Sequence, residues 1–308
     1  MKAIAYFCNG IGNLVMMLPA LQAVASLTET NTIDILLGEW DDNRKGAVLE
    51  ILKQWPVADK VLEPPYRLRS DDYDLWFFSQ HGKNGDITVM FREKIVRPVP
   101  KPSWRTSMIH ETDHYMEVAY SLGYKGEIPQ VQFPLAEKPD LSALPRPIIG
   151  ICNGFFRTDY WKKKAWPHFD GLVHNLKHYF NGTVIGVGES GELDGVDLEP
   201  ENNFCGKLTI TETAKVISQM DLLITSDTGN MHIADILGVP TVTLFGSTLG
   251  SKNSPRNKQS VTLMSGVECA PCQDTGRFYN CKDYLCMKSI TVGDVMAVVR
   301  QKINQPFK

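Results

Sequence analysis

The chain has no long apolar run and no large excess of charge of either sign. No stretch reaches the roughly 18 uninterrupted apolar residues that a membrane-spanning helix requires, so we expect at most peripheral contact with a membrane. Acidic and basic residues nearly balance, 35 against 32, and a net charge of -3 argues against nucleic acid as a partner. The N-terminus has one lysine before a short strand pattern rather than the longer apolar run of a signal peptide, so we expect a cytoplasmic protein.

The glycine-containing loop near the N-terminus lacks part of the fingerprint of dinucleotide-binding proteins. Gly10 and Gly12 follow the first predicted strand and permit a tight turn close to a ligand. The third glycine is missing because Val15 stands at its position, and Asp34 lies near the beginning of the second strand rather than at its end. A nicotinamide-dependent oxidoreductase is therefore disfavoured. A ligand-binding turn and a turn that serves only backbone geometry both remain open.

Strand and helix patterns alternate along the whole chain, and 308 residues suffice for two domains of about 150 residues each. Strand patterns occur at residues 2–7, 33–37, 59–62, 74–78, 148–152, 183–187, 221–225, 240–245 and 260–264. Helix patterns occur at about residues 13–27, 44–54, 106–122, 167–180, 211–219, 229–237 and 292–304. A proline-rich segment at 133–147 is the predicted linker. We expect two doubly wound α/β domains, 1–140 and 146–308, with a ligand site in the cleft between them.

Residues 226–246 form the most informative stretch, a polar loop and helix followed by a strand. The loop Asp227-Thr228-Gly229 comes directly after an apolar strand. Backbone N–H groups of such a loop lie at the carboxyl end of a parallel strand, where a helix N-terminus favours phosphate. Thr228 and Gly229 can donate hydrogen bonds to a diphosphate. Asp227 is either a helix cap or the residue that orients the loop, and His232 either donates to a phosphate or belongs to the core.

A basic loop follows the strand at 148–152 and precedes a helix whose first turn suits Pro167. We expect the ammonium group of Lys164 to lie at the mouth of the sheet and to bind phosphate. We expect Lys162 and Lys163 to be solvated.

An acidic loop follows the strand at 183–187, at the same edge of the sheet. Either Glu189 or Glu192 could accept hydrogen bonds from the hydroxyl groups of a ribose. At least one of the two is expected to be merely exposed.

Seven cysteines, an odd number, divide into two groups. The isolated ones lie in apolar segments and are expected to be small buried hydrophobes: Cys8, Cys152 and Cys205. The others fall within 18 residues of a polar segment: Cys269, Cys272, Cys281 and Cys286. Their spacing suits a closed, structural thiolate site for zinc or iron. A disulfide and unliganded thiols are the alternatives.

These motifs together resemble glycosyltransferase family 9, the heptosyltransferase family of lipopolysaccharide assembly. The strongest similarity lies in Ser226-Asp227-Thr228-Gly229-Asn230-Met231-His232-Ile233-Ala234, with Leu237-Gly238-Val239-Pro240-Thr241 and Phe245-Gly246. Further matches, in order, are Gly10-Ile11-Gly12, Leu18-Pro19-Ala20-Leu21, Lys164-Ala165-Trp166-Pro167 and Gly206-Lys207-Leu208-Thr209. The resemblance covers most of the chain and is looser between about residues 38 and 105.

The resemblance implies a GT-B architecture, with two Rossmann-like domains facing a central cleft. The C-terminal domain would hold a nucleotide-diphosphate sugar, most often ADP-heptose, and the N-terminal domain would hold the acceptor. The sugar would move with inversion and without a catalytic metal to a hydroxyl of a surface glycan or a protein. Lys164, the Thr228-Gly229 turn and His232 would stabilise the leaving diphosphate. Some relatives carry a cysteine-rich C-terminal loop, which holds iron in a branch that acts on proteins.

One position departs from the resemblance. Family members commonly have Asp after the second glycine, as the proposed general base, whereas Asn13 cannot take a proton here. Three alternatives are open: the base is relocated, the acceptor is activated in another way, or activity is lost and binding is kept. The candidates for a relocated base lie at the start of the helix at 106–122: His110, Glu111, Asp113 and His114. The simpler interpretation of that run is an ordinary helix start with Thr106 or Ser107 as N-cap. A pseudoenzyme or partner subunit that only binds a nucleotide sugar is the alternative function.

Overall fold

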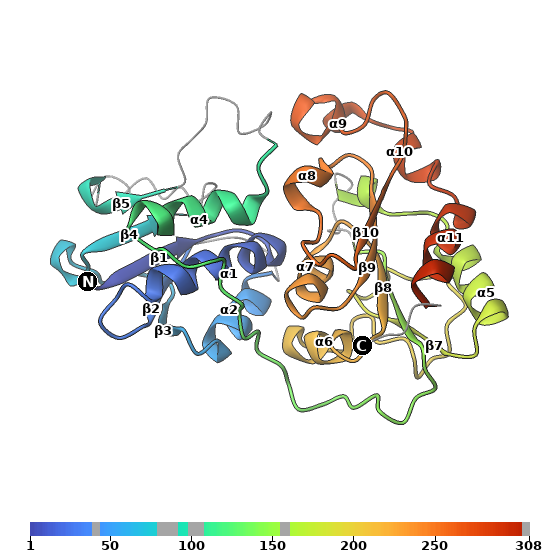
Figure 1. The fold of residues 1–308 in the computed structure, drawn as a ribbon, viewed down its shortest axis with the longest axis horizontal. Coiled ribbons are helices and arrows are strands. Elements are labelled where there is room, and N and C mark those ends of the chain that lie inside the picture. The colour runs from blue at the N-terminus through green and yellow to red at the C-terminus, as the bar shows by residue number, and fades with distance from the viewer. Residues whose placement is uncertain (39–43, 79–91, 98–107, 155–160, 304–308) are drawn as a thin grey trace. The chain divides into compact units, whose positions relative to one another are not determined.

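The computed structural model describes residues 1–38, 44–78, 92–97, 108–154 and 161–303. The chain divides into two compact units, Met1–Pro134 and Leu135–Lys308, called here the N-terminal and C-terminal units. Each unit contains a five-stranded parallel sheet and α-helices that connect its strands (Figure 1). The prediction of an α/β protein with two Rossmann-like doubly wound domains is confirmed.

The sheet of the N-terminal unit has the strand order β3-β2-β1-β4-β5. Its strands are β1 (Ala3–Phe7), β2 (Ile33–Leu37), β3 (Ala58–Leu62), β4 (Leu75–Phe78) and β5 (Ile95–Val96). Its helices are α1 (Ile11–Ala25), α2 (Arg44–Gln54) and α4 (Glu111–Ser121), with short 3-10 turns η1 (Ser70–Asp72) and η2 (Arg92–Lys94). Every residue of β1 and β2 is buried, as is typical of parallel strands that have both faces covered.

The sheet of the C-terminal unit has the strand order β10-β9-β8-β6-β7. Its strands are β6 (Ile148–Cys152), β7 (Thr183–Gly186), β8 (Leu222–Ser226), β9 (Thr241–Phe245) and β10 (Val261–Met264). The main helices are α5 (Phe169–Tyr179), α6 (Ile210–Ile217), α7 (Gly229–Ile236) and α11 (Val292–Ile303). Shorter elements are η4 (Trp161–Lys164), α8 (Gly250–Asn253), η5 (Gln273–Thr275), α9 (Arg277–Asn280) and α10 (Leu285–Lys288).

The predicted start of the helix at 106–122 is wrong. Helix α4 begins at Glu111, because His110 is its N-cap and the ring Nδ1 accepts a hydrogen bond of 3.2 Å from the backbone N–H of Thr112. The predicted caps, Thr106 and Ser107, lie outside the described residues.

Two other expectations about the elements need correction. Pro167 lies outside α5, which has His168 as N-cap and begins at Phe169. Strand β5 was not predicted, since two residues are too few to show a strand period.

The proline-rich segment predicted as a linker is largely attached to the C-terminal unit. The backbone N–H of Ala136 donates to the carbonyl of Thr211. Arg146 forms an ion pair of 2.5 Å with Asp221, whose carboxylate also accepts from the backbone N–H of Ile148 at the start of β6. These contacts hold residues 135–147 against α6 and the sheet. None of the helices among the described residues is both long and apolar enough to span a bilayer.

Candidate functional site

The candidate site lies at the carboxyl ends of β6 and β8 in the C-terminal unit. The chain runs from β6 to β7 on one side and returns to β8 on the other, so the strand order reverses between β6 and β8. Cys152, the last residue of β6, pairs with Thr225 near the end of β8. Open α/β sheets bind their ligands at such a switch point.

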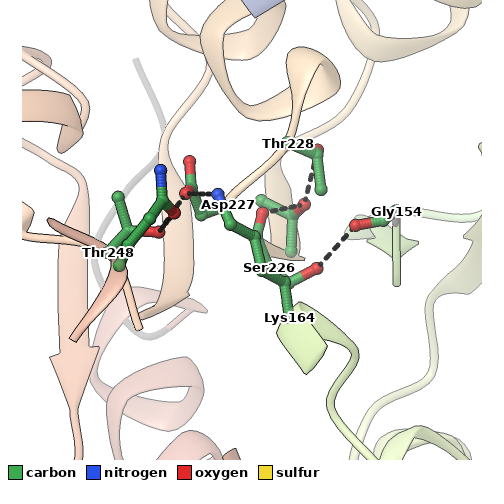
Figure 2. A network of polar contacts seen from close by, with 8 residues as sticks. Gly154, Lys164, Ser226, Asp227, Thr228 and Thr248 are labelled. Atoms are coloured by element: carbon green, nitrogen blue, oxygen red, sulfur yellow. Dashed lines mark hydrogen bonds and ion pairs between the residues drawn. The ribbon is translucent and has the colours of Figure 1, made fainter. Parts of the chain in front are cut away.

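A buried ion pair occupies this edge of the sheet. The ammonium group of Lys164 lies 2.6 Å from Oδ2 of Asp227, and the two side chains are 14% and 7% exposed. The hydroxyl of Thr248 donates to the same oxygen at 2.7 Å (Figure 2). The lysine expected at the mouth of the sheet therefore lies there, oriented by the aspartate that follows β8.

Asp227 is held in its ionised form by its neighbours. Burial opposes ionisation, but the charge and hydrogen bond of Lys164, the nearby His232 and the hydrogen bond of Thr248 lower the pKa of the Asp227 carboxyl below its usual range. Asp227 is thus the residue that orients the loop, since Thr228, and not Asp227, is the N-cap of α7.

The N-terminus of α7 presents its backbone N–H groups without a side-chain cap. Thr228 has an extended backbone at the N-cap, and its side chain makes no capping hydrogen bond. The first N–H groups of the helix, from Gly229 onward, therefore have no intrahelical acceptor and form the kind of site that binds phosphate. His232, one turn into the helix, is 4% exposed and close enough to Asp227 to affect its pKa.

Thr248 and Gln273 belong to this polar network and were not predicted. The hydroxyl of Thr248 lies 3.1 Å from Oε1 of Gln273 as well as beside Asp227. Thr248 comes shortly after β9, at the same edge of the sheet. Its position after a predicted strand could therefore have indicated a site residue. Gln273 carried no such signal, because only the tertiary structure brings residues 269–286 to this edge.

Of the two predicted ribose contacts, Glu192 lies beside the end of β6. Its Oε2 is 3.9 Å from Sγ of Cys152, and its carboxylate occupies the space that a side chain at Gly188 would need. Glu189 is exposed. Burial and the charge of Glu192 raise the pKa of Cys152 to about 12, so this thiol is neutral and serves as a small buried group.

Lys163 does not lie in solvent, contrary to the expectation. It is 8% exposed, and its ammonium donates to the carbonyls of Phe278 at 2.8 Å and Tyr279 at 3.0 Å. Lys162 is exposed, as expected. Lys163 therefore ties the turn that carries Lys164 to α9.

Residues 269–286, called here the thiol segment, carry the four clustered cysteines, and all four are free thiols: Cys269, Cys272, Cys281 and Cys286. Burial raises the pKa of Cys286 to about 11, and charges on Cys272 and Cys281 add to the shift, so these groups lie within electrostatic range of one another. The donor set has the chemistry of a thiolate metal site. Yet nowhere in the described ranges do three His, Cys, Asp or Glu side chains gather as metal ligands. The predicted metal site is not assembled in this structure.

In the N-terminal unit, the loop between β1 and α1 meets the start of α4. Gly10 is the N-cap of α1, again without a side-chain cap, and Gly12 lies in the first turn. The amide of Asn13 donates to Oε1 of Glu111 at 2.7 Å. Nδ1 of His114 lies 3.3 Å from Oε2 of Glu117. His110 caps α4, and Asp113 is half-buried in its first turn.

Two Rossmann-like units, with an uncapped helix N-terminus beside a buried lysine in the second, define a protein of the GT-B class. The model of glycosyltransferase family 9 (heptosyltransferase) matches residues 96–282, more than half of the chain. The chain belongs to this family and is a glycosyltransferase, which confirms the resemblance.

Similar proteins cover nearly the whole chain. Lipooligosaccharide heptosyltransferase 2 of Campylobacter jejuni is 24% identical over 99% of this chain and 100% of the relative. The structure of E. coli ADP-heptose lps heptosyltransferase II is 16% identical, covers 98% of each chain and has a TM-score of 0.68. E. coli heptosyltransferase WaaC, solved with ADP-2-deoxy-2-fluoro heptose, is 15% identical, covers 98% of this chain and 99% of its own and has a TM-score of 0.65.

Proposed function

We propose that this glycosyltransferase moves a heptose from ADP-heptose, or a closely similar nucleotide-diphosphate sugar, to a hydroxyl of a surface glycan. The observation that carries the proposal is the buried Lys164–Asp227 pair beside the uncapped N-terminus of α7. That arrangement suits a diphosphate, and the heptosyltransferases to which the chain is similar include one solved with an ADP-heptose analogue. A cytoplasmic location stays a prediction of the sequence.

The donor would bind through its diphosphate. Its oxygens accept hydrogen bonds from the N–H groups that begin with Gly229 and from the hydroxyl and N–H of Thr228. An ammonium group has three donors, so Lys164 can hold Asp227 and a phosphate oxygen together. His232 would contribute a further donor, and Glu192, rather than Glu189, would accept from the ribose. Charge that develops on the leaving diphosphate is then stabilised without a metal ion.

Transfer would proceed with inversion, in one displacement, onto an acceptor held by the N-terminal unit. The proposed acceptor contact is the start of α1, at Gly10 and Gly12. The backbone N–H groups of this start lie at the carboxyl ends of the parallel strands. A protein acceptor and a nucleotide-sugar-binding pseudoenzyme are the alternatives, which the assay below separates from glycan transfer.

The test is a transfer assay with ADP-heptose and a truncated lipooligosaccharide acceptor, with EDTA present. We expect release of ADP, a mass gain of one heptose and an inverted anomeric centre by NMR. ADP binding without transfer to either a glycan or a protein acceptor would favour the pseudoenzyme. Neither binding nor transfer with any nucleotide sugar would contradict the proposal.

Lys164→Ala is expected to weaken ADP binding about 10- to 100-fold, since a hydrogen bond to a charged group contributes about 1.5–3 kcal/mol. Lys162→Ala, in the same turn and exposed, is the matched control and should bind ADP as the wild type does. Calorimetric titration measures both. Equal affinity of the two variants would remove Lys164 from the donor site.

A structural zinc or iron ion at the four clustered cysteines remains a proposal that rests on their spacing alone. Metal analysis of the purified protein should find about one ion per chain, and Cys272→Ser should lose it. A folded, metal-free wild type would refute the site. Cys8→Ser, outside the segment, is the control.

A further inference from the structure

A buried carboxylate lies beside the loop between β1 and α1 in the N-terminal unit. Oε1 of Glu111 accepts a hydrogen bond of 2.7 Å from the amide of Asn13 and one of 2.9 Å from the hydroxyl of Tyr115. Glu111 is 3% exposed. Two donors on one oxygen fix the orientation of this carboxylate.

The packing of α1 against α4 produces this arrangement. Asn13 lies in the first turn of α1, and Glu111 lies in the first turn of α4, 98 residues later. Tyr115 is one turn further along α4 and therefore on the same face as Glu111. Burial, together with the charge of Glu111, raises the pKa of Tyr115 well above its usual range, so the hydroxyl remains a donor at neutral pH.

The other ionisable groups at the start of α4 are placed differently. The ring of His110 accepts from the backbone of α4 as its cap, and His114 faces Glu117. Asp113 is two residues beyond Glu111, about 200° further around the helix, so it points to another side. The hydrogen bond with Asn13 joins Glu111 to the first turn of α1.

We propose that Glu111 is the general base of the transfer reaction, with Asn13 and Tyr115 as positioning residues. The inference rests on the proposed function. The acceptor oxygen forms a bond to the anomeric carbon, and the bond from that carbon to the diphosphate oxygen breaks with its electron pair. The proton of the acceptor hydroxyl passes to the carboxylate of Glu111. Charge and atoms balance without any further reactant.

The first test compares Glu111→Gln with Glu117→Gln, the same substitution on the same helix at a carboxylate that faces His114. Loss of a general base is expected to lower kcat about 10²- to 10⁴-fold, while the affinity for ADP stays within about twofold of the wild type. Glu117→Gln should retain kcat within about threefold. A Glu111→Gln enzyme with wild-type kcat would overturn the proposal.

The second test separates a base from a merely structural carboxylate. Glu111→Ala leaves space for a small external carboxylate, so added formate should restore kcat in proportion to its concentration. A folded Glu111→Ala enzyme that binds ADP and gains nothing from formate would also overturn the proposal. Asn13→Ala alone should lower kcat about tenfold. The double variant Asn13→Ala/Glu111→Gln should be little slower than Glu111→Gln alone, because the two residues act as one unit.

Failure of the inference and failure of the proposed function are distinguishable. The proposed function fails if the wild type transfers no heptose. The inference fails if the wild type transfers heptose and Glu111→Gln does so at the same rate.

Discussion

At the scale of single residues, Asp227 connects the stability of the C-terminal unit to the proposed donor site. The carboxylate accepts from both Lys164 and Thr248, and it is 7% exposed. Removal of one partner of a buried ion pair leaves an uncompensated charge and costs about 3–5 kcal/mol. The same residue therefore orients the lysine that is proposed to bind phosphate and contributes to folding.

The lowered pKa of Asp227 predicts how stability depends on pH. Because its pKa in the folded state lies below the unfolded value of about 4, the ionised carboxylate stabilises the fold above that pH. This contribution is lost as the pH falls through the folded pKa. The unfolding free energy of the wild type should thus fall more steeply below about pH 4 than that of Asp227→Asn, measured by urea titration at several pH values. The exposed Asp194→Asn is the control, and parallel curves for wild type and Asp227→Asn would contradict the prediction.

At the scale of elements, the thiol segment is attached at two places to residues around the proposed donor site. The backbone N–H groups of Cys272 and Gln273 donate to the carbonyl of Ser247, just after β9. Lys163 binds α9 from the turn that also carries Lys164. A displacement of the segment would therefore be transmitted to Thr248 and to the lysine turn.

Gly246→Ala tests this attachment. A Cβ at Gly246 would lie 2.5 Å from Sδ of Met287 and 2.9 Å from Sγ of Cys286, closer than packed atoms allow. We expect overpacking to lower the unfolding free energy by about 1–3 kcal/mol and to weaken ADP binding. Gly266→Ala, with no atom within 4 Å of the new Cβ, is the matched control. Unchanged stability of Gly246→Ala would show that the segment shifts freely.

At the scale of the whole molecule, each unit has its own sheet, and the proposed donor residues belong to one unit. A ligand that binds only the native state raises stability by about 2.7 kcal/mol at a hundredfold excess over its Kd. ADP alone should therefore slow hydrogen exchange in the C-terminal unit, most clearly at residues 226–232. Exchange in α1 and α4 should change only when an acceptor is added. Protection of α1 by ADP alone would place the nucleotide elsewhere.

Most strands and the longer helices of both units were predictable because their signals are local. The apolar run at 148–152 coincides with β6, and the predicted strand at 33–37 coincides with β2, since a buried parallel strand shows as a short continuous apolar run. Glycine and proline mark the turn between α7 and β9. The predicted helix ends were less accurate where a capping side chain sets the first residue, as His110 does for α4.

The sequence by itself determined the fold class, the family and the loop that carries Asp227 and Thr228, because each of these depends on neighbours along the chain. The tertiary structure alone decided that Glu111 meets Asn13 and that Gln273 meets Thr248. It also placed Lys163 against α9 rather than in solvent. These contacts join residues 25 to 115 positions apart, and no local period or motif encodes which distant side chains the packing of helices and loops brings together.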